Sequence, residues 1–409
     1  MKRNKFDYLI IFFIVSLFFG LLGGALQVPR LLGVIFLPLL LTNINFLCHN
    51  RKVKELLKFF LFFFSYCIIS VVWTPDKVIA LKEFFYFSTE TAYLLEIILF
   101  SMKSNKPLQS ILNGWYIFVI ITFPIALFEI FMDVHLGMST FESDAMVNVG
   151  GGIIAQKRFA SVTFGNYNTY ATVLCLGTPF MLLKTLHRES FFKELFNYIV
   201  LLVLLYIVVT IASRGALLAL GIIFLIYIYY RHKLKFSSNK FLSFLLLLLL
   251  VLGLFYYGNE IFEQVTNRMT KSEVKDEALF EDAGRINIIL VTLEASVNNL
   301  FIGHGIGSML PVLTEYKASI PIAHNLLLEI LLQYGFIITL YFIVFICNIY
   351  LRGFYSYDLR FKFFIYSTLF SLPIISVINS GYLHMLFIWA FFASLFSIAF
   401  IIKQPIGCD

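Results

Sequence analysis

The stretch TIASRGALLAL, residues 210–220, lies in the middle of an apolar run in which every residue from Leu195 to Tyr230 is uncharged except Arg214. A single helix over this run would be roughly 54 Å long, whereas the hydrocarbon core of a bilayer is about 30 Å thick. The run is therefore long enough for two membrane spans. An arginine at the bilayer centre costs at least ~2.5 kcal/mol, so we expect a hairpin tip at 213–215 that holds Arg214 at a membrane surface or against protein.

The composition indicates a polytopic helical membrane protein. Of the 409 residues, 60% are hydrophobic, 18% aromatic and only 13% charged, a balance that soluble domains do not have. The apolar runs are continuous and do not alternate with polar residues, so the strands of a membrane barrel are not expected. The net charge of +7 is scattered among loops and does not indicate a nucleic-acid partner.

The apolar runs predict an all-α protein with about twelve transmembrane helices, of which the first is an uncleaved helix rather than a signal peptide. The predicted spans are 8–26, 30–48, 56–73, 78–100, 110–132, 165–183, 194–212, 215–231, 241–258, 324–351, 363–379 and 381–402. If the N-terminus is cytoplasmic, the inner loops and the two tails contain 20 of the 31 Lys and Arg residues. We therefore expect both termini in the cytoplasm.

This topology divides the chain into helices and two long outer loops. The expected parts are transmembrane helices over 1–132, an outer loop over 133–164, helices over 165–258, a large outer loop over 259–321 and helices over 322–409. Loops of this length between membrane helices usually serve function. The five cysteines fall in spans or on the cytoplasmic side, so no disulfide or thiolate metal site is expected.

Few basic residues lie on the predicted outer face, so each is a candidate for binding. Lys157 and Arg158 precede FASVTFGNYNTYA, where the chain re-enters the membrane. Arg285 opens GRINIILVTLEASVNNL, whose apolar spacing predicts an amphipathic helix on the membrane surface. A cation is slightly unfavourable in the first turn of a helix, which favours a special role for Arg285. Interfacial anchoring explains any one of these residues equally well.

The segment SIPIAHNLLLEILLQYG supplies a candidate base. Pro321 is typical of a helix start and places His324 and Asn325 in the first turn of the tenth span. Free N–H groups at a helix start favour an anion and the neutral form of a nearby histidine, so His324 is a candidate general base. A lone histidine at a membrane interface is also commonly structural. We expect Glu329 to support Asn325 or a neighbouring span rather than to act in catalysis.

Two other outer motifs are weaker candidates. The glycines of FIGHGIGSML have the spacing G-x-G-x-G and follow a helix rather than a strand, so we interpret the motif as a flexible turn that includes His304. Asp276, Glu277, Glu281 and Asp282 form an acidic cluster beside lysines, which is more typical of a solvated surface than of a metal site.

Taken in order, SRGALLAL, GRINIILVTLEASVNNLFIGHGIG and HNLLLEILLQYG resemble the conserved core of bacterial O-antigen ligases and polymerases, and RFASVTFGNYNTYA resembles the segment before that core. The resemblance implies a fold similar to GT-C-type glycosyltransferases. It also implies transfer of a glycan from undecaprenyl diphosphate to an acceptor sugar at the outer face of the bacterial plasma membrane, with no metal or other cofactor. The family's essential arginines correspond to Arg214 and Arg285, its essential histidine to His324, and Arg158 is a looser match.

The chemistry of this reaction suits these residue types. An acceptor hydroxyl attacks the anomeric carbon while the lipid diphosphate departs, so guanidinium groups stabilise the growing negative charge and one base takes the proton. We therefore expect His324, Arg214 and Arg285 to be catalytic. The expected substrate-binding residues also include Lys157, Arg158 and Asn325. The expected partners are a lipid-linked donor, a glycan acceptor, membrane lipid and a chain-length regulator.

Three activities remain open at this point. The ligase branch of the family has His-Asn followed after nine residues by Gly-x-x-(Gly, Thr or Tyr), whereas here Gly335 is followed by Ile338, which favours a polymerase over a ligase. A flippase or transporter of lipid-linked glycans also suits twelve spans with acids inside them, namely Glu90, Glu96 and Glu129. However, the sequence has no internal repeat, and its informative charges lie at one face.

Overall fold

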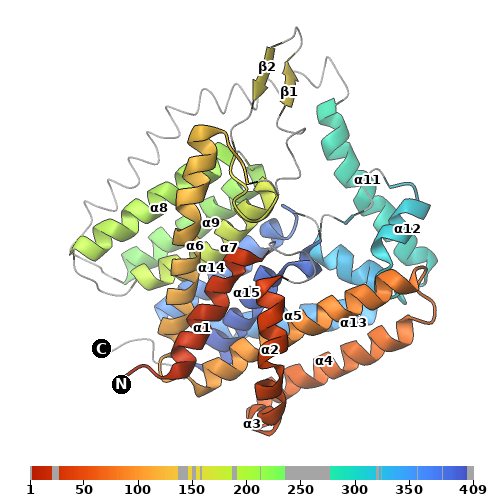
Figure 1. Cartoon of the computed structure of the whole chain (residues 1–409), viewed down its shortest axis with the longest axis horizontal. Helices are drawn as coiled ribbons and strands as arrows, with labels where there is room; N and C mark the ends of the chain where they lie inside the picture. Colours follow the sequence, from red (N-terminus) through yellow and green to blue (C-terminus); the bar gives the residue numbers. More distant parts are fainter. Residues whose placement is uncertain are drawn as a thin grey trace.

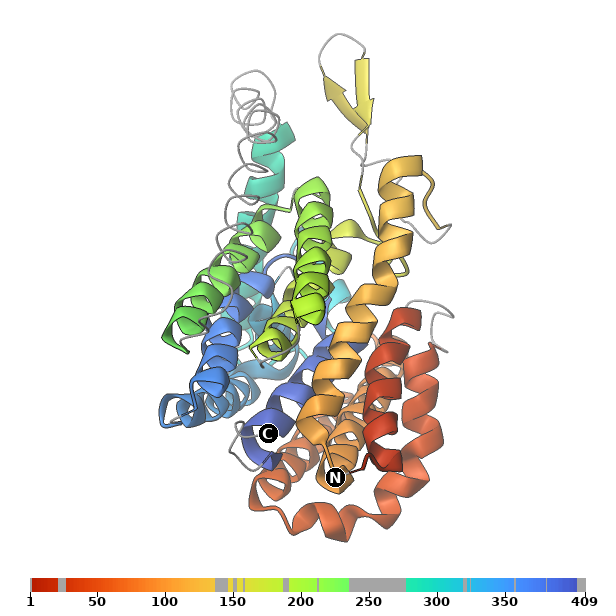
Figure 2. The same ribbon diagram turned by 90° about the vertical axis from the view of Figure 1, so that its left-hand side faces the viewer.

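The computed structural model describes a bundle of tilted helices with one short β-hairpin (Figures 1 and 2). The described residues are 2–20, 27–136, 146–149, 153–156, 159–186, 191–211, 213–234, 277–318, 322–323, 325–356, 358–379 and 381–402. Figure 2 shows the hairpin and the first turns of α11 projecting at the end of the molecule opposite the start of α1.

The hairpin adds one short β element to a structure whose other described regular elements are helical, as expected. Strand β1 (Met146–Val149) pairs antiparallel with β2 (Ile153–Gln156), within the predicted loop 133–164. The sequence MVNVGGGIIAQ explains this hairpin, because two runs with β-branched residues flank three glycines that favour a tight turn.

The helices before the hairpin pack into one aromatic-rich core. Their bounds are α1 Lys5–Ser16, η1 Leu17–Phe19, α2 Val28–Thr42, α3 Ile44–Cys48, α4 Arg51–Ser70, α5 Lys77–Lys103 and α6 Pro107–Met132. Helix α1 lies along α6, and α2 lies along α5. Phe13 of α1 stacks on Tyr93 of α5 with ring centroids 5.1 Å apart, and both side chains are fully buried.

The helices after the hairpin extend the same core. Their bounds are α7 Tyr167–Thr185, α8 Phe191–Ile211, α9 Arg214–Lys233, α11 Glu277–Asn298, α12 Met309–Glu315, α13 Leu326–Phe354, α14 Leu359–Ile375, η5 Tyr382–His384, α15 Leu386–Phe396 and the π-helical η6 Ser397–Ile401. Helix α9 packs along α14, and α13 lies beside α4 (Figure 1). Helices α8 and α9 divide the long apolar run, which is therefore two helices rather than one.

Several helices have the length and composition of membrane spans, which makes the chain an integral membrane protein. Within the described residues the long apolar helices are α6, α9, α13 and residues 192–211 of α8, and shorter apolar helices cover Val28–Thr42, Asn287–Asn298 and Leu386–Ile401. The expected span at 241–258 lies outside the described residues. The twelve-span arrangement, its orientation and the five-part division of the chain remain predictions.

Asp7 joins three helices at the end of the molecule where α1 begins. Its buried carboxylate accepts hydrogen bonds from the backbone N–H groups of Asn4 at 2.6 Å and Lys106 at 2.9 Å and from the hydroxyls of Ser104 and Ser110. Burial opposes the charged carboxylate, but these hydrogen bonds outweigh it and lower the pKa of Asp7. Asp7 therefore stabilises the fold above its unfolded-state pKa, and that stabilisation is lost as the pH falls through its folded-state pKa.

Replacing Asp7 by alanine tests this junction. Asp7→Ala leaves several buried donors without an acceptor, so we expect the free energy of unfolding to fall by about 1–3 kcal/mol. The matched control is Glu55→Ala, because Glu55 forms only exposed ion pairs with Arg51 and Lys52, and we expect a loss below about 1 kcal/mol. Thermal unfolding of both variants in detergent measures the difference, and equal unfolding midpoints would contradict this role.

Candidate functional site

The structure describes three of the six predicted site residues at least in part. Arg214 is the first residue of α9, and its side chain is exposed. Arg285 lies on α11, where the structure describes its backbone and not its side chain. Asn325 is described, whereas Lys157, Arg158 and His324 lie outside the described residues.

Two local expectations are corrected. Helix α11 begins at Glu277, so Arg285 is not in a first turn and the dipole argument for its special role is wrong. Asn325 does not lie inside the first turn of α13 but is its N-cap, with backbone angles of φ −158° and ψ 125°. Its side-chain oxygen accepts hydrogen bonds from the N–H groups of Leu327 at 2.9 Å and Leu328 at 3.2 Å. Asn325, one residue after His324, therefore fixes where α13 begins.

The turn between α14 and α15 contacts the first turns of α13 and α7. We call its described residues, 376–379 and 381–385, the α14–α15 turn. The N–H group of Leu326, the first residue of α13, donates to the carbonyl of Ser376 at 3.3 Å. The side-chain amide of Asn379 donates to the hydroxyl of Thr169, near the start of α7, at 2.8 Å. This turn therefore joins the HNLLLEILLQYG segment to the RFASVTFGNYNTYA segment.

The same turn contacts the first turns of α9 and α2. A Cβ atom on Gly215, beside Arg214, would lie only 2.9 Å from the side chain of Ile378. At the start of α2, the guanidinium of Arg30 donates to the carbonyl of His384 at 3.2 Å. Four helices from distant parts of the sequence thus have their N-terminal turns against one turn of chain.

This arrangement favours an anionic ligand. A helix N-terminus carries a partial positive charge and unpaired N–H groups. Neither Ser213 before α9 nor Gln27 before α2 makes a side-chain capping bond. The guanidinium of Arg214 adds a full positive charge at the start of α9. The start of α9, with Arg214, is therefore the part of this end that is suited to phosphate groups.

Glu329 holds the α14–α15 turn in place. This carboxylate in the first turn of α13 is fully buried. It accepts hydrogen bonds from the N–H groups of Gly381 at 2.6 Å, Tyr382 at 3.0 Å and Leu383 at 3.2 Å. The expectation that Glu329 supports a neighbouring element is confirmed.

The GHGIG turn inserts into a break in α13. Gly335 interrupts the helix with φ 77° and ψ −179°. Near this break the N–H group of His304 donates to the carbonyl of Leu332 at 2.9 Å, and that of Gly305 donates to the carbonyl of Gln333 at 2.9 Å. The imidazole of His304 also bonds the carbonyl of Ala295 at 3.0 Å. The motif is a turn as expected, but its hydrogen bonds anchor it between α11 and α13.

The same region fixes α11, the helix that carries Arg285, to α13. Val291 and Ala295 of α11 pack with Leu313 of α12 and Leu332 of α13 in a small apolar cluster. Gly335, the glycine of the ligase-like pattern, thus has a structural task, because it permits the close approach that holds α11 beside the start of α13.

Replacing Gly335 by alanine should therefore lower the thermal unfolding midpoint and the yield of folded protein. The new Cβ would lie 2.1 Å from the carbonyl oxygen of Ile302, at a positive φ that alanine rarely adopts. Backbone strain alone costs about 1–3 kcal/mol, and the clash adds to it. The control is Gly221→Ala in α9, where a Cβ meets nothing within 4 Å and helix propensity improves by about 1 kcal/mol.

The readouts are the thermal unfolding midpoint and the yield of folded protein after size-exclusion chromatography. We expect a clear loss for Gly335→Ala and none for Gly221→Ala. Wild-type stability in Gly335→Ala would contradict the close docking of the GHGIG turn.

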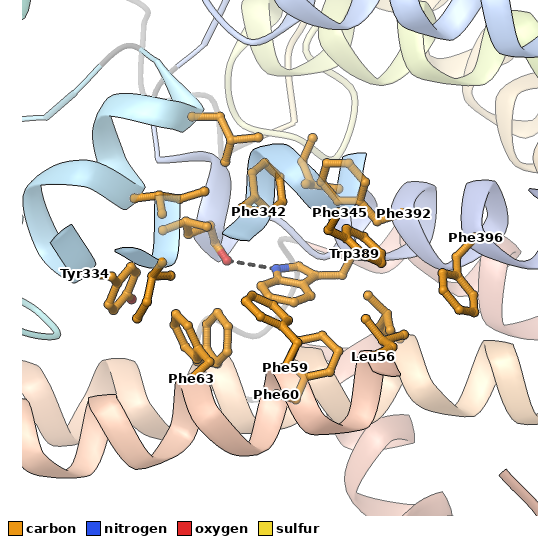
Figure 3. Close-up of a pocket in the computed structure, with 17 residues that line it drawn as sticks. Leu56, Phe59, Phe60, Phe63, Tyr334, Phe342, Phe345, Trp389, Phe392 and Phe396 are labelled. Atoms are coloured by element: carbon orange, nitrogen blue, oxygen red, sulfur yellow. Dashed lines mark hydrogen bonds between the residues drawn. The ribbon is translucent and has the colours of Figure 1, made fainter. Parts of the chain in front are cut away.

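An apolar cavity opens beside the α14–α15 turn. It lies between α4, α5, α13 and α15, has a cavity volume of about 60 Å³, and all its lining side chains are apolar or aromatic (Figure 3). Leu326 and Leu383 lie in its wall, so one part of the cavity reaches the start of α13 and the α14–α15 turn. Such a lining suits a hydrocarbon chain rather than a sugar. The side chains labelled in Figure 3 are Leu56, Phe59, Phe60, Phe63, Tyr334, Phe342, Phe345, Trp389, Phe392 and Phe396.

Two of the three acids that suit a transporter have structural partners. Glu90 forms a buried ion pair with Arg30 at 2.8 Å. Glu129 accepts hydrogen bonds from the N–H groups of Ser161 at 2.7 Å and Val162 at 2.8 Å, which fixes the segment before α7. The carboxylate of Glu96 is buried and has no hydrogen-bond partner among the described residues.

Sequence reasoning missed Arg30 and His384, which both contact the site. Each lies at the edge of an apolar run, where a charged or titratable residue is easily taken for an interfacial anchor. The predicted topology could have indicated that Arg30 and His384 lie near each other, because it brings the starts of the spans at 30–48 and 381–402 to the same membrane face. Their partners Glu90 and Glu83 are distant in sequence, so the pairing itself was not visible.

The fold and site define an integral membrane protein that joins a polar, anion-suited end to an apolar cavity. Residues 199–343 match the O-antigen ligase family. The resemblance inferred from its motifs is confirmed. Members of this family are membrane glycan polymerases and ligases, and the matched region contains Arg214, Arg285, His324 and Asn325.

The chain is also similar in sequence to a protein of Bacillus subtilis. The chain is 22% identical over 298 residues to the teichuronic acid biosynthesis protein TuaE of Bacillus subtilis (strain 168). The similarity covers 71% of this chain and 59% of that relative, so less than two thirds of the relative is matched.

Proposed function

We propose that this chain is a surface-polysaccharide polymerase. In this proposal it transfers a glycan from undecaprenyl diphosphate to a lipid-linked repeat unit at the outer face of the bacterial plasma membrane. The observation that supports it most directly is the meeting of four helix N-termini and Arg214 beside an apolar cavity. One ligand with a diphosphate and a long hydrocarbon chain would satisfy both halves of this site.

The donor lipid would lie across the two halves. Its diphosphate would bind Arg214 and Arg285, with Lys157 and Arg158 contributing, and the first carbons of its polyprenyl chain would enter the cavity between α4 and α15. The first turn of α9 would add its partial charge to those of the guanidinium groups. This orientation requires the α14–α15 turn at the outer face and both termini in the cytoplasm.

His324 would act as the base. The acceptor hydroxyl attacks the anomeric carbon from the side opposite the diphosphate, so the configuration inverts, and His324 takes the hydroxyl proton. The bond to the diphosphate oxygen breaks, and Arg214 and Arg285 stabilise the charge that develops there. The donor already contains its activated bond, and guanidinium groups stay protonated, so this mechanism uses no metal ion or nucleotide. Asn325 would position His324 by fixing the start of α13.

A ligase is the second candidate, because the family that matches residues 199–343 takes its description from O-antigen ligase. It would use the same donor and the same residues but pass the glycan to lipid A core or another anchor. The departure at Ile338 from the ligase pattern favours the polymerase. The name of TuaE suits biosynthesis of a surface glycan by either activity. A transporter is less favoured, since Glu90 and Glu129 have structural partners.

Deletion of the gene in its native bacterium, followed by gel analysis of surface glycans and extracted lipid-linked glycans, tests this function. We expect long chains to vanish while single lipid-linked repeats persist, and wild-type protein to restore the long chains. His324→Ala should reduce the transfer rate roughly 10²–10⁴-fold, and Arg214→Ala or Arg285→Ala roughly 10²–10³-fold. The matched control is Arg51→Ala, because Arg51 is an exposed arginine that pairs with Glu55 on the surface of α4.

The other outcomes separate the candidates. Long chains that accumulate on undecaprenyl diphosphate and never reach an anchor would indicate a ligase. An unaltered glycan profile in the deletion strain would contradict both enzymes. Full activity of a normally folded Arg214→Ala variant would contradict the proposed diphosphate site.

A further inference from the structure

A second group of polar side chains surrounds His384, and the proposed mechanism does not use it. Arg30 of α2 forms its buried ion pair with Glu90 of α5 at 2.8 Å and also donates to the carbonyl of His384 at 3.2 Å. The guanidinium lies over the ring of Tyr86, 4.0 Å from its centroid. These contacts fix the backbone of His384 against α2 and α5.

The imidazole of His384 is oriented by a second carboxylate. Its Nε2 lies 3.3 Å from an oxygen of Glu83, and about a third of the side chain, 33%, is exposed. No described residue bonds the other ring nitrogen, Nδ1. The second oxygen of Glu83 is buried and also has no hydrogen-bond partner among the described residues. The pair therefore retains hydrogen-bonding capacity that the described protein does not use.

The charges around this pair disfavour a phosphate. Glu83, Glu90 and Glu329 all lie near His384, and the nearby Arg30 is already paired. Because the guanidinium of Arg30 is already paired and three acids face His384, this group attracts a diphosphate less than the start of α9 does. A sugar hydroxyl, in contrast, is neutral and bonds equally well with an imidazole nitrogen or a carboxylate oxygen.

The position of His384 matches the approach of the acceptor. It directly follows the three N–H groups that Glu329 of α13 binds, and Leu326 at the start of α13 bonds the same turn. His324, the proposed base, precedes this start by two residues. The acceptor hydroxyl must reach that base, so the acceptor sugar must come close to the α14–α15 turn.

We propose that His384 is an acceptor-binding residue, whose Nδ1 hydrogen-bonds a hydroxyl of the acceptor's terminal sugar, and that Glu83 is the positioning residue that orients its ring. This inference rests on the proposed glycosyl transfer and extends it from the donor to the acceptor. It divides the site into a cationic part for the donor diphosphate and an acidic part for the acceptor sugar.

The test separates the two substrates. Full-length protein in lipid nanodiscs receives the undecaprenyl-diphosphate-linked glycan as donor. The acceptor is the repeat unit on a short alkyl chain without diphosphate, which cannot serve as donor. KM is measured for each substrate in the wild type, His384→Ala, His384→Gln and Glu83→Gln, with Glu55→Gln as an exposed control. Thermal unfolding checks that each variant is folded.

We expect His384→Ala and Glu83→Gln to raise the KM for the acceptor at least fivefold while the KM for the donor changes less than twofold. His384→Gln should recover part of the loss, because its amide also bonds a hydroxyl. An unchanged acceptor KM in folded His384→Ala and Glu83→Gln, or an equal rise in both KM values, would overturn the inference and leave the proposed function intact. Absence of any transfer by the wild type would instead contradict the proposed function and this inference with it.

Discussion

The bonds between the carboxylate of Glu329 and three successive N–H groups of the α14–α15 turn hold the site together. A buried carboxylate without partners is strongly destabilising, so the turn and the first turn of α13 require each other. Once the turn is fixed, the starts of α7 and α9 pack on it through Asn379 and Ile378. The buried carboxylate of Glu329 thus positions the turn on which the start of α9, with Arg214, packs.

The break at Gly335 has a matching role on the opposite side of α13. Its positive φ leaves room for the GHGIG turn, which holds α11 in place. The two features act on one helix within two turns of each other, and they fix the α14–α15 turn and α11 against α13. Motifs that are weak when taken singly in the sequence become informative because they share this framework.

The sequence predicts the fold class well and the site in part. The length of the apolar run around Arg214 requires a break there, and Glu329 is recognisable as a supporting residue because it is turned away from His324 on a helix. The position of Asn325 is misjudged by one residue, because its N-cap role depends on backbone angles at 325 rather than on Pro321. The hairpin at 146–156 is missed because the loop is treated only by its length. Arg30, Glu83 and His384 come together through contacts between distant helices, which no local pattern contains.

In the proposed mechanism one site binds a diphosphate at the start of α9 and a hydrocarbon chain in the adjacent cavity. Electron cryo-microscopy of the protein in nanodiscs with an undecaprenyl-diphosphate-linked glycan tests it directly. We expect density for the diphosphate beside Arg214 and the first turn of α9, with the first carbons of the polyprenyl chain among the phenylalanines of α4 and α15. A headgroup bound at the opposite end of the bundle, near Asp7, or a hydrocarbon chain lying outside this cavity would contradict it.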